Sequence, residues 1–253
     1  MRTLDALRVP VGDCERAAAF FGAVFGWTFS DVRGTADPDH GPAAGSSAIV
    51  AQQAGPAGLL PSADLMFTAH DPAPGPVLCL SGSDPQADAY RVERLGGWAS
   101  VAADAGTAIG ADREGTPLRL GGHRRKMVPG RVRPGGAAGS RGVLGVIFVY
   151  VRDLDGAATF YRELCGWSFT AVGRDRDILF AEDGPPLGLR PADKQASGQT
   201  GAVGFHISVR EPARVADDII ARAGQAGPPQ LAGAFSIRPC RDDQGTAFSL
   251  WSD

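Results

Sequence analysis

The amino-acid sequence predicts an α+β protein of two tandem domains. Each domain is expected to contain two βαβββ modules, which form a curved mixed sheet around a cleft with the helices packed outside. Three repeats support this fold class. The segment Asp13–Phe29 (DCERAAAFFGAVFGWTF) recurs at Asp153–Phe169 (DLDGAATFYRELCGWSF) with an offset of 140. At an offset of 130, residues 51–61 match 181–191, and 112–120 match 242–250. A repeat of this length indicates two copies of one domain, so a site is sought at equivalent positions in both.

The first repeated segment predicts a strand, a helix and a second strand. In the second copy, β-branched and aromatic residues fill 146–151, which is typical of a strand. Asp153 is placed to cap a helix whose apolar residues recur at i, i+3, i+4 and i+7 from Ala157 to Leu164. Gly166 is expected to end that helix, because glycine readily takes the left-handed conformation found there.

The remaining elements follow from the same patterns. In the first copy we expect strands at 4–11, 48–51, 58–60, 77–80 and 116–120, with helices at 13–25 and from 84 to 96–97. In the second copy we expect strands at 146–151, 168–172, 177–181, 187–190, 203–209 and 246–251, with helices at 154–165 and 212–224. The predicted domains are 1–121 and 143–253.

Residues 122–142 form a predicted linker, rich in glycine, proline and arginine. It carries six lysine and arginine residues and no acidic one. A solvated strap between the domains is the favoured interpretation. A phosphate-binding arm is the alternative, and no aromatic residue is interleaved to support it.

The composition of the chain limits the classes of function that it can have. The 253 residues carry a net charge of -3 and are 43% hydrophobic, which is ordinary for a globular protein. No apolar run reaches about 18 residues and no signal peptide is evident, so we expect a cytoplasmic protein without a membrane or nucleic-acid partner. Four cysteines without metal-binding spacing are expected to be reduced thiols.

The motif RDLDGAATFYRELCGWSF, the ending RDDQGTAFSLWSD and their repetition resemble the vicinal oxygen chelate superfamily. That family includes glyoxalase I, extradiol dioxygenases, fosfomycin-resistance enzymes and bleomycin-resistance proteins. The resemblance covers nearly all of 4–120 and 144–252. It implies two clefts, each lined by the first, fifth and last strands of a copy.

The resemblance also implies where metal ligands would lie. The family's first-strand histidine, fifth-strand ligand and last-strand glutamate fall on Ala6, Cys79 and Arg119 in the first copy, and on Val146, His206 and Ser249 in the second. A divalent site needs about three protein ligands with N, O or S donors. We therefore predict no metal and no cofactor in either copy.

The second copy offers an aromatic cleft. Strand alternation gathers on one face the predicted ligand-binding residues Phe148, Tyr150, His206, Ser208, Ser249 and Trp251. Such a face suits a small-molecule site. The alternatives are a filled core and, for His206, a hydrogen-bonded structural histidine.

The matching face of the first copy carries Arg8, Cys79 and Arg119. Two arginines on one cleft would suit a carboxylate or phosphate ligand. The alternative is that each arginine pairs with a neighbouring acid or reaches solvent. Trp27 and Trp167, which follow the helix-ending glycines, are expected to be structural.

Two functions remain open. The first is a metal-independent protein that binds an aromatic or polyketide-like small molecule, in secondary metabolism or self-resistance. The second is a metal-independent tailoring enzyme that uses His206 as acid or base and Tyr150 as a donor. Whether the protein is an enzyme is left open, and we expect a monomer or homodimer.

Overall fold

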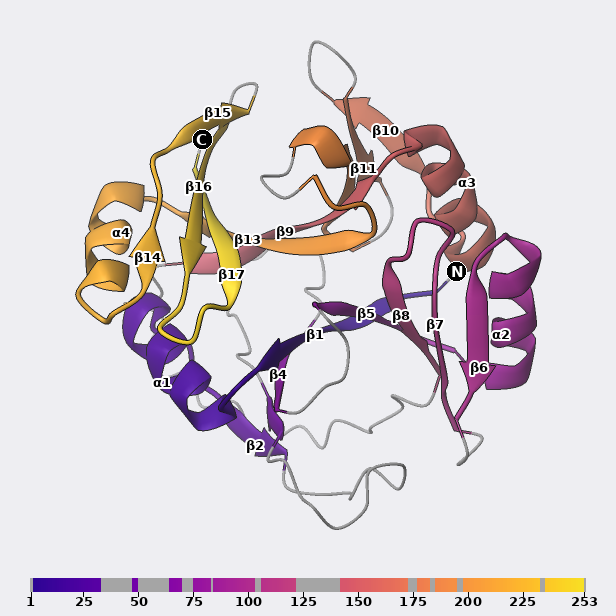
Figure 1. Ribbon diagram of the computed structural model, residues 1–253, viewed down its shortest axis with the longest axis horizontal. Coiled ribbons are helices and arrows are strands. Elements are labelled where there is room, and N and C mark those ends of the chain that lie inside the picture. The colour runs from indigo at the N-terminus through magenta and orange to yellow at the C-terminus, as the bar shows by residue number, and fades with distance from the viewer. Residues whose placement is uncertain are drawn as a thin grey trace.

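A computed structural model describes residues 2–32, 47–49, 64–69, 75–82, 84–102, 106–121, 142–172, 177–182, 185–194, 198–232 and 235–252. These residues form two curved mixed sheets with four helices (Figure 1). The predicted α+β fold class is thereby confirmed. None of the helices in these ranges is long and apolar enough to cross a membrane.

The first sheet has the order β2-β3-β4-β1-β5-β8-β7-β6. Its central strand β1 runs parallel to β4 and antiparallel to β5, and β5 runs parallel to β8. Each half is therefore one βαβββ module. The elements are β1 (Leu4–Val11), α1 (Cys14–Phe25), β2 (Ser30–Val32), β3 (Ser47–Ile49), β4 (Asp64–Ala69), β5 (Val77–Leu80), α2 (Pro85–Arg94), β6 (Trp98–Val101), β7 (Ala108–Ala111) and β8 (Pro117–Leu120).

The second sheet repeats this arrangement in the order β10-β11-β12-β9-β13-β17-β16-β14, with β15 also paired to β16. The two sheets curve in opposite directions, with β1, β5, β9 and β13 toward the middle of the molecule (Figure 1). The elements are β9 (Gly142–Val151), α3 (Leu154–Cys165), β10 (Phe169–Val172), β11 (Ile178–Ala181), β12 (Leu187–Pro191), a 3-10 helix (Ala192–Lys194), β13 (Ala202–Val209), α4 (Pro212–Ile220), β14 (Gln225–Ala226), β15 (Gln230–Ala232), β16 (Phe235–Arg241) and β17 (Ala247–Ser252).

Helices α1 and α3 begin and end for the predicted reasons. The Asp13 carboxylate accepts a hydrogen bond from the Arg16 amide at 3.0 Å, and that of Asp153 from the Gly156 amide at 2.9 Å. Each caps an otherwise unpaired amide of the first turn. The glycines that follow, Gly26 and Gly166, have φ of 73° and 79°, a left-handed conformation that favours glycine.

The structure corrects the alignment of the two copies before β4. Leu65 pairs with Leu7 of β1 as Leu187 pairs with Ile147 of β9, so these strands are offset by 122 rather than 130. The predicted strand at 58–60 lies outside the described residues. A longer connection in the first copy moves β4 to residues 64–69, which displaces the sequence match.

Other boundaries also differ. Strand β9 starts at Gly142, the last residue of the predicted linker, because residues 142–144 and 146 pair with β13. Helix α4 ends at Ile220 rather than at Gly224, and a turn containing Ala223 at φ 61° follows it. The predicted βαβββ modules imply strands after the second helix of each copy, but no residue ranges were predicted for β6, β7 and β14–β16. The domain limits 1–121 and 143–253 stay a prediction.

Both copies contribute to one hydrophobic core, which we call the shared core. The ring of Phe21 on α1 packs 4.9 Å from Phe67 of its own sheet and 5.2 Å from Phe248 of the other sheet, between ring centroids. Helix α1 also contacts α4. Because a helix of the first copy fills space beneath the second sheet, the two copies are joined by packing as well as by sequence.

Reciprocal hydrogen bonds reinforce this junction. The Trp27 indole donates to the Gly142 carbonyl at 2.8 Å, and the Trp167 indole donates to the Arg2 carbonyl at 2.9 Å. Residues 2 and 142, like 27 and 167, are equivalent positions at the offset of 140. Each tryptophan therefore links the C-terminal end of a helix in one copy to the first residues of the other copy. This agrees with the structural role expected for Trp27 and Trp167.

Two equivalent turns also contact the other copy. The turn at 112–116 contacts the first residues of α3, and the turn at 242–246 contacts the first residues of α1. The Gln244 side chain accepts from the Asp13 amide at 2.7 Å, and the Glu114 carboxylate accepts from the Asp153 amide at 3.3 Å. Arg16 also pairs with Asp243 across the junction. These contacts hold the turns that precede β8 and β17.

Candidate functional site

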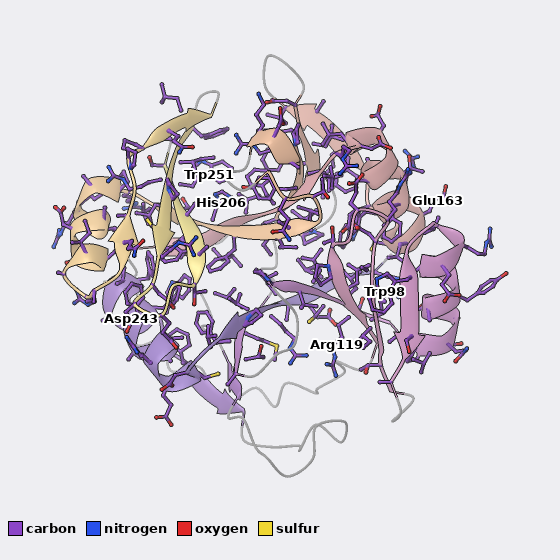
Figure 2. All side chains as sticks on the ribbon, viewed as in Figure 1. Trp98, Arg119, Glu163, His206, Asp243 and Trp251 are labelled. Carbon is purple, nitrogen blue, oxygen red and sulfur yellow. The ribbon has the colours of Figure 1, made fainter. Side chains whose placement is uncertain are left out.

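The strand register places the predicted site positions of each copy side by side. His206 on β13 pairs with residues of both β9 and β17, and Cys79 on β5 pairs with residues of both β1 and β8. Directly paired residues project from the same side of a sheet. Each copy therefore presents one row of three on one face. The rows are Ala6–Cys79–Arg119 and Val146–His206–Ser249, and the labelled residues Arg119 and His206 lie in different sheets (Figure 2).

The second row adjoins a small apolar cluster, separate from the shared core, that we call the aromatic cluster. Its centre is Phe148, whose ring centroid lies 5.6 Å from Phe180 and 6.3 Å from Trp251. Tyr150 also contacts this ring at 6.4 Å. The buried members are Val146, Phe148, Tyr150 and Ala192, and the half-buried members are Ile178, Phe180, Ala202 and Trp251.

Two glycines leave room for these rings. Gly188 and Gly204 pair with Phe148 on its two sides. An added Cβ would lie 2.5 Å from the Phe148 ring at Gly188 and 3.1 Å from the Tyr150 ring at Gly204. Neither glycine has a positive φ, so close approach of the rings is what requires the missing side chain.

His206 is the polar group next to this cluster. Its imidazole is 1% exposed and stands edge-on to Phe148, with ring centroids 5.0 Å apart. Burial, aided by the charge of Arg190, lowers its pKa to about 3, so the ring is neutral at pH 7. Its Nδ1 is buried without a hydrogen-bond partner among the described residues. Buried polar atoms are normally hydrogen-bonded, so this nitrogen is one of the exceptions among the described residues.

Tyr150 and Arg190 complete the polar part of the site. They are direct neighbours on β9 and β12, and Arg190 lies within hydrogen-bonding reach of the Tyr150 hydroxyl. Burial raises the pKa of Tyr150, and the nearby positive charge of Arg190 opposes this. The guanidinium carbon lies 5.9 Å from the centroid of the Phe148 ring. Arg190 was not predicted, although alternation along 187–190 would have placed it beside Tyr150 once the strand register was known.

The other predicted residues divide between the two sheets. Ser208 and Ser249 are half-buried in the second copy, where Ser208 pairs with Trp251. In the first copy Cys79 is 2% exposed, whereas Arg8 and Arg119 are half-buried. The described residues form no second aromatic cluster on the first copy's row. The structure therefore brings six of the predicted residues together in the second copy. The other three lie in the first copy, where Cys79 pairs with Arg119.

The path of the chain matches solved structures over nearly its whole length. The 2,3-dioxygenase LapB from Pseudomonas sp. KL28 aligns with a TM-score of 0.58 at 11% identity, covering 98% of this chain and 91% of that one. The Mn(II)-bound glyoxalase from Novosphingobium aromaticivorans gives 0.54 at 14%, covering 100% and 83%. A mutant of 4-hydroxymandelate synthase from Streptomyces coelicolor gives 0.53 at 14%, covering 99% and 92%.

The chain has the vicinal oxygen chelate fold. The resemblance stated from the sequence motifs is thus confirmed at the level of the fold. A family model described as "Bleomycin resistance protein-like N-terminal" also matches residues 6–34. No curated protein sequence matches the chain significantly.

The residues of this chain do not fit the metal associated with the vicinal oxygen chelate fold. Of the row in the second copy, His206 supplies an imidazole, Ser249 a hydroxyl and Val146 no donor. The row in the first copy supplies one thiol, from Cys79. Within the described ranges, no group of three or more His, Cys, Asp or Glu residues is placed to hold a metal ion. A divalent site needs about three protein ligands, so neither row completes one.

Proposed function

We propose that the second copy binds a small aromatic or polyketide-like molecule without a metal, in secondary metabolism or self-resistance. The observation that carries this proposal is the buried imidazole of His206, whose unpartnered Nδ1 adjoins the aromatic cluster. A flat ligand against the half-buried Phe180 and Trp251 would gain about 25 cal/mol per Å² of buried apolar area. One hydrogen bond to His206 would fix its orientation.

The similarity of residues 6–34 to a bleomycin-resistance-like model supports a binding role. The donor sets of the two rows support metal independence, because one imidazole and one thiol are the strongest ligands that they offer.

The alternative is a metal-independent enzyme in which His206 acts as acid or base and Tyr150 as a donor. A general acid or base works best when its pKa is close to the working pH. The pKa of His206 is lowered to about 3 and that of Tyr150 is raised, so both side chains stay neutral near pH 7. This electrostatic setting favours binding, in which a neutral imidazole offers one donor and one acceptor.

The test is calorimetric titration of chelator-treated protein with a panel of aromatic compounds. We expect His206→Ala to weaken binding about tenfold, because one hydrogen bond is lost among many contacts. Cys79→Ala, at the equivalent position of the first copy, is the matched control and should leave affinity unchanged. Tyr150→Phe removes a donor while keeping the shape of the ring.

Two results would redirect the assignment. If His206→Ala leaves affinity intact but lowers turnover of a substrate by about 100-fold, the protein is an enzyme. If His206→Ala and Tyr150→Phe change nothing while Arg8→Ala or Arg119→Ala abolishes binding, the site lies in the first copy and takes an anion.

A further inference from the structure

Arg190 is a cation placed against the apolar surface of the aromatic cluster. Its guanidinium lies over the Phe148 ring, and its Nε is buried without a hydrogen-bond partner among the described residues. The polar neighbour that it does have is the Tyr150 hydroxyl.

Several other arginines of the described chain are paired. Arg2 pairs with Asp88, Arg16 with Asp243 and Arg113 with Asp153, whereas none of the described carboxylates forms an ion pair with Arg190. A half-buried guanidinium over an aromatic ring loses part of its hydration, and a bound anion would compensate that loss. His206 is neutral and adds no second positive charge, so the described groups of this site match a single negative charge.

We propose that the ligand of the second copy is an aromatic acid, whose carboxylate binds Arg190 and the Tyr150 hydroxyl while its ring packs on Trp251. This rests on the proposed binding function and deepens it. The guanidinium carbon and the Trp251 ring lie 5.9 and 6.3 Å from the centroid of Phe148, so a molecule of one or two rings can reach both. A guanidinium presents parallel N–H donors that match the two oxygens of a carboxylate.

The experiment compares 2-naphthoate with 2-naphthamide, which has nearly the same shape but no charge, by calorimetry on chelator-treated protein. Wild-type protein should bind the acid about tenfold more tightly than the amide, because charge-assisted hydrogen bonds are stronger than neutral ones. Arg190→Met should remove this preference by weakening the acid about tenfold, with the amide changed by less than about threefold. Arg190→Lys keeps the charge and should retain part of the preference.

Arg238→Met is the matched control. Arg238 also has a buried Nε without a described partner, but it pairs with Leu250, a residue of the shared core, and so lies on the opposite face of the same sheet. It should leave binding of the acid unchanged. Equal binding of acid and amide to wild-type protein, with both weakened by Trp251→Ala, would overturn the anionic ligand and keep the aromatic site. Absence of saturable binding of either compound would overturn both.

Discussion

A buried hydrogen bond between Tyr161 and Asp112 has no equivalent at Phe21 and Asp242. This difference predicts the effect on protein stability of one substitution at Tyr161 and one at Phe21. The Tyr161 hydroxyl on α3 donates to Asp112 Oδ2 at 2.9 Å. The other oxygen of Asp112 accepts from the Glu114 and Thr116 amides at 2.9 and 2.8 Å. Tyr161→Phe removes the donor and leaves a buried carboxylate oxygen unsatisfied. We expect a loss of about 1–3 kcal/mol in the free energy of unfolding.

The first copy already has phenylalanine at the position equivalent to Tyr161, so the opposite substitution can be tested there. Phe21 occupies the position equivalent to Tyr161, and Asp242 repeats Asp112, with Oδ1 accepting from the Gln244 and Thr246 amides at 2.9 and 2.7 Å. Its Oδ2 is buried without a described partner, because phenylalanine has no hydroxyl. Phe21→Tyr should restore the missing bond and raise stability by about 0.5–1 kcal/mol.

Urea denaturation followed by far-UV circular dichroism measures both changes. Burial raises the pKa of Asp112, whereas the Tyr161 hydrogen bond lowers it by favouring the charged form. Loss of that bond raises the folded-state pKa further, so the cost of Tyr161→Phe should shrink as the pH falls and Asp112 becomes protonated. A cost that is below about 0.3 kcal/mol at pH 7, or that grows on acidification, would refute the reasoning. Strong destabilisation by Phe21→Tyr would mean that overpacking outweighs the new bond.

Three further predictions follow from the junction and the site. Trp27→Phe and Trp167→Phe each remove one hydrogen bond between the copies, and each should lower the free energy of unfolding by about 1 kcal/mol. Thermal unfolding, followed by calorimetry, should remain a single transition. Two separated transitions would contradict the shared core. The pKa of His206 is lowered to about 3 from 6.5, so the unfolded chain binds its proton first and stability falls as the pH drops from about 6.5 toward 3. In His206→Gln the decrease between pH 7 and 5 should be smaller by about 2 kcal/mol, and an unchanged pH profile would show that the imidazole is not held neutral. Elemental analysis should find no stoichiometric zinc, iron, manganese or nickel; one equivalent of metal per chain with chelator-sensitive activity would overturn metal independence.

The sequence was sufficient for the repeated architecture. Capping aspartates, helix periodicity and stop glycines are local signals, so α1 and α3 were predicted closely. The resemblance to the vicinal oxygen chelate superfamily implied that His206 lies beside Val146 and Ser249, and Cys79 beside Ala6 and Arg119, and the strand register agrees.

What the sequence did not predict depends on contacts distant along the chain. Strand β4 is displaced by a longer connection. Strands β6 (WASV) and β7 (AIGA) are each only 4 residues long, and their sequences do not alternate polar with apolar residues. Arg190 lies beside Tyr150 because β12 pairs with β9, and this pairing cannot be predicted from the sequence of either strand alone. The shared core and the bonds of Trp27 and Trp167 are contacts between copies, which a comparison of the copies alone does not show.

The most direct test of the central claim is long-range 1H–15N NMR of the histidine side chains during titration with 2-naphthoate in chelator-treated protein. The chain has four histidines, so the spectrum is simple, and His206→Ala assigns the signal of His206. We predict that the side-chain 15N resonances of His206 shift saturably as the naphthyl ring packs on Trp251, whose ring centroid lies 6.4 Å from that of the imidazole, without added metal and with little change at the other three. A saturable shift at a different histidine, or one that requires added divalent metal, would contradict it.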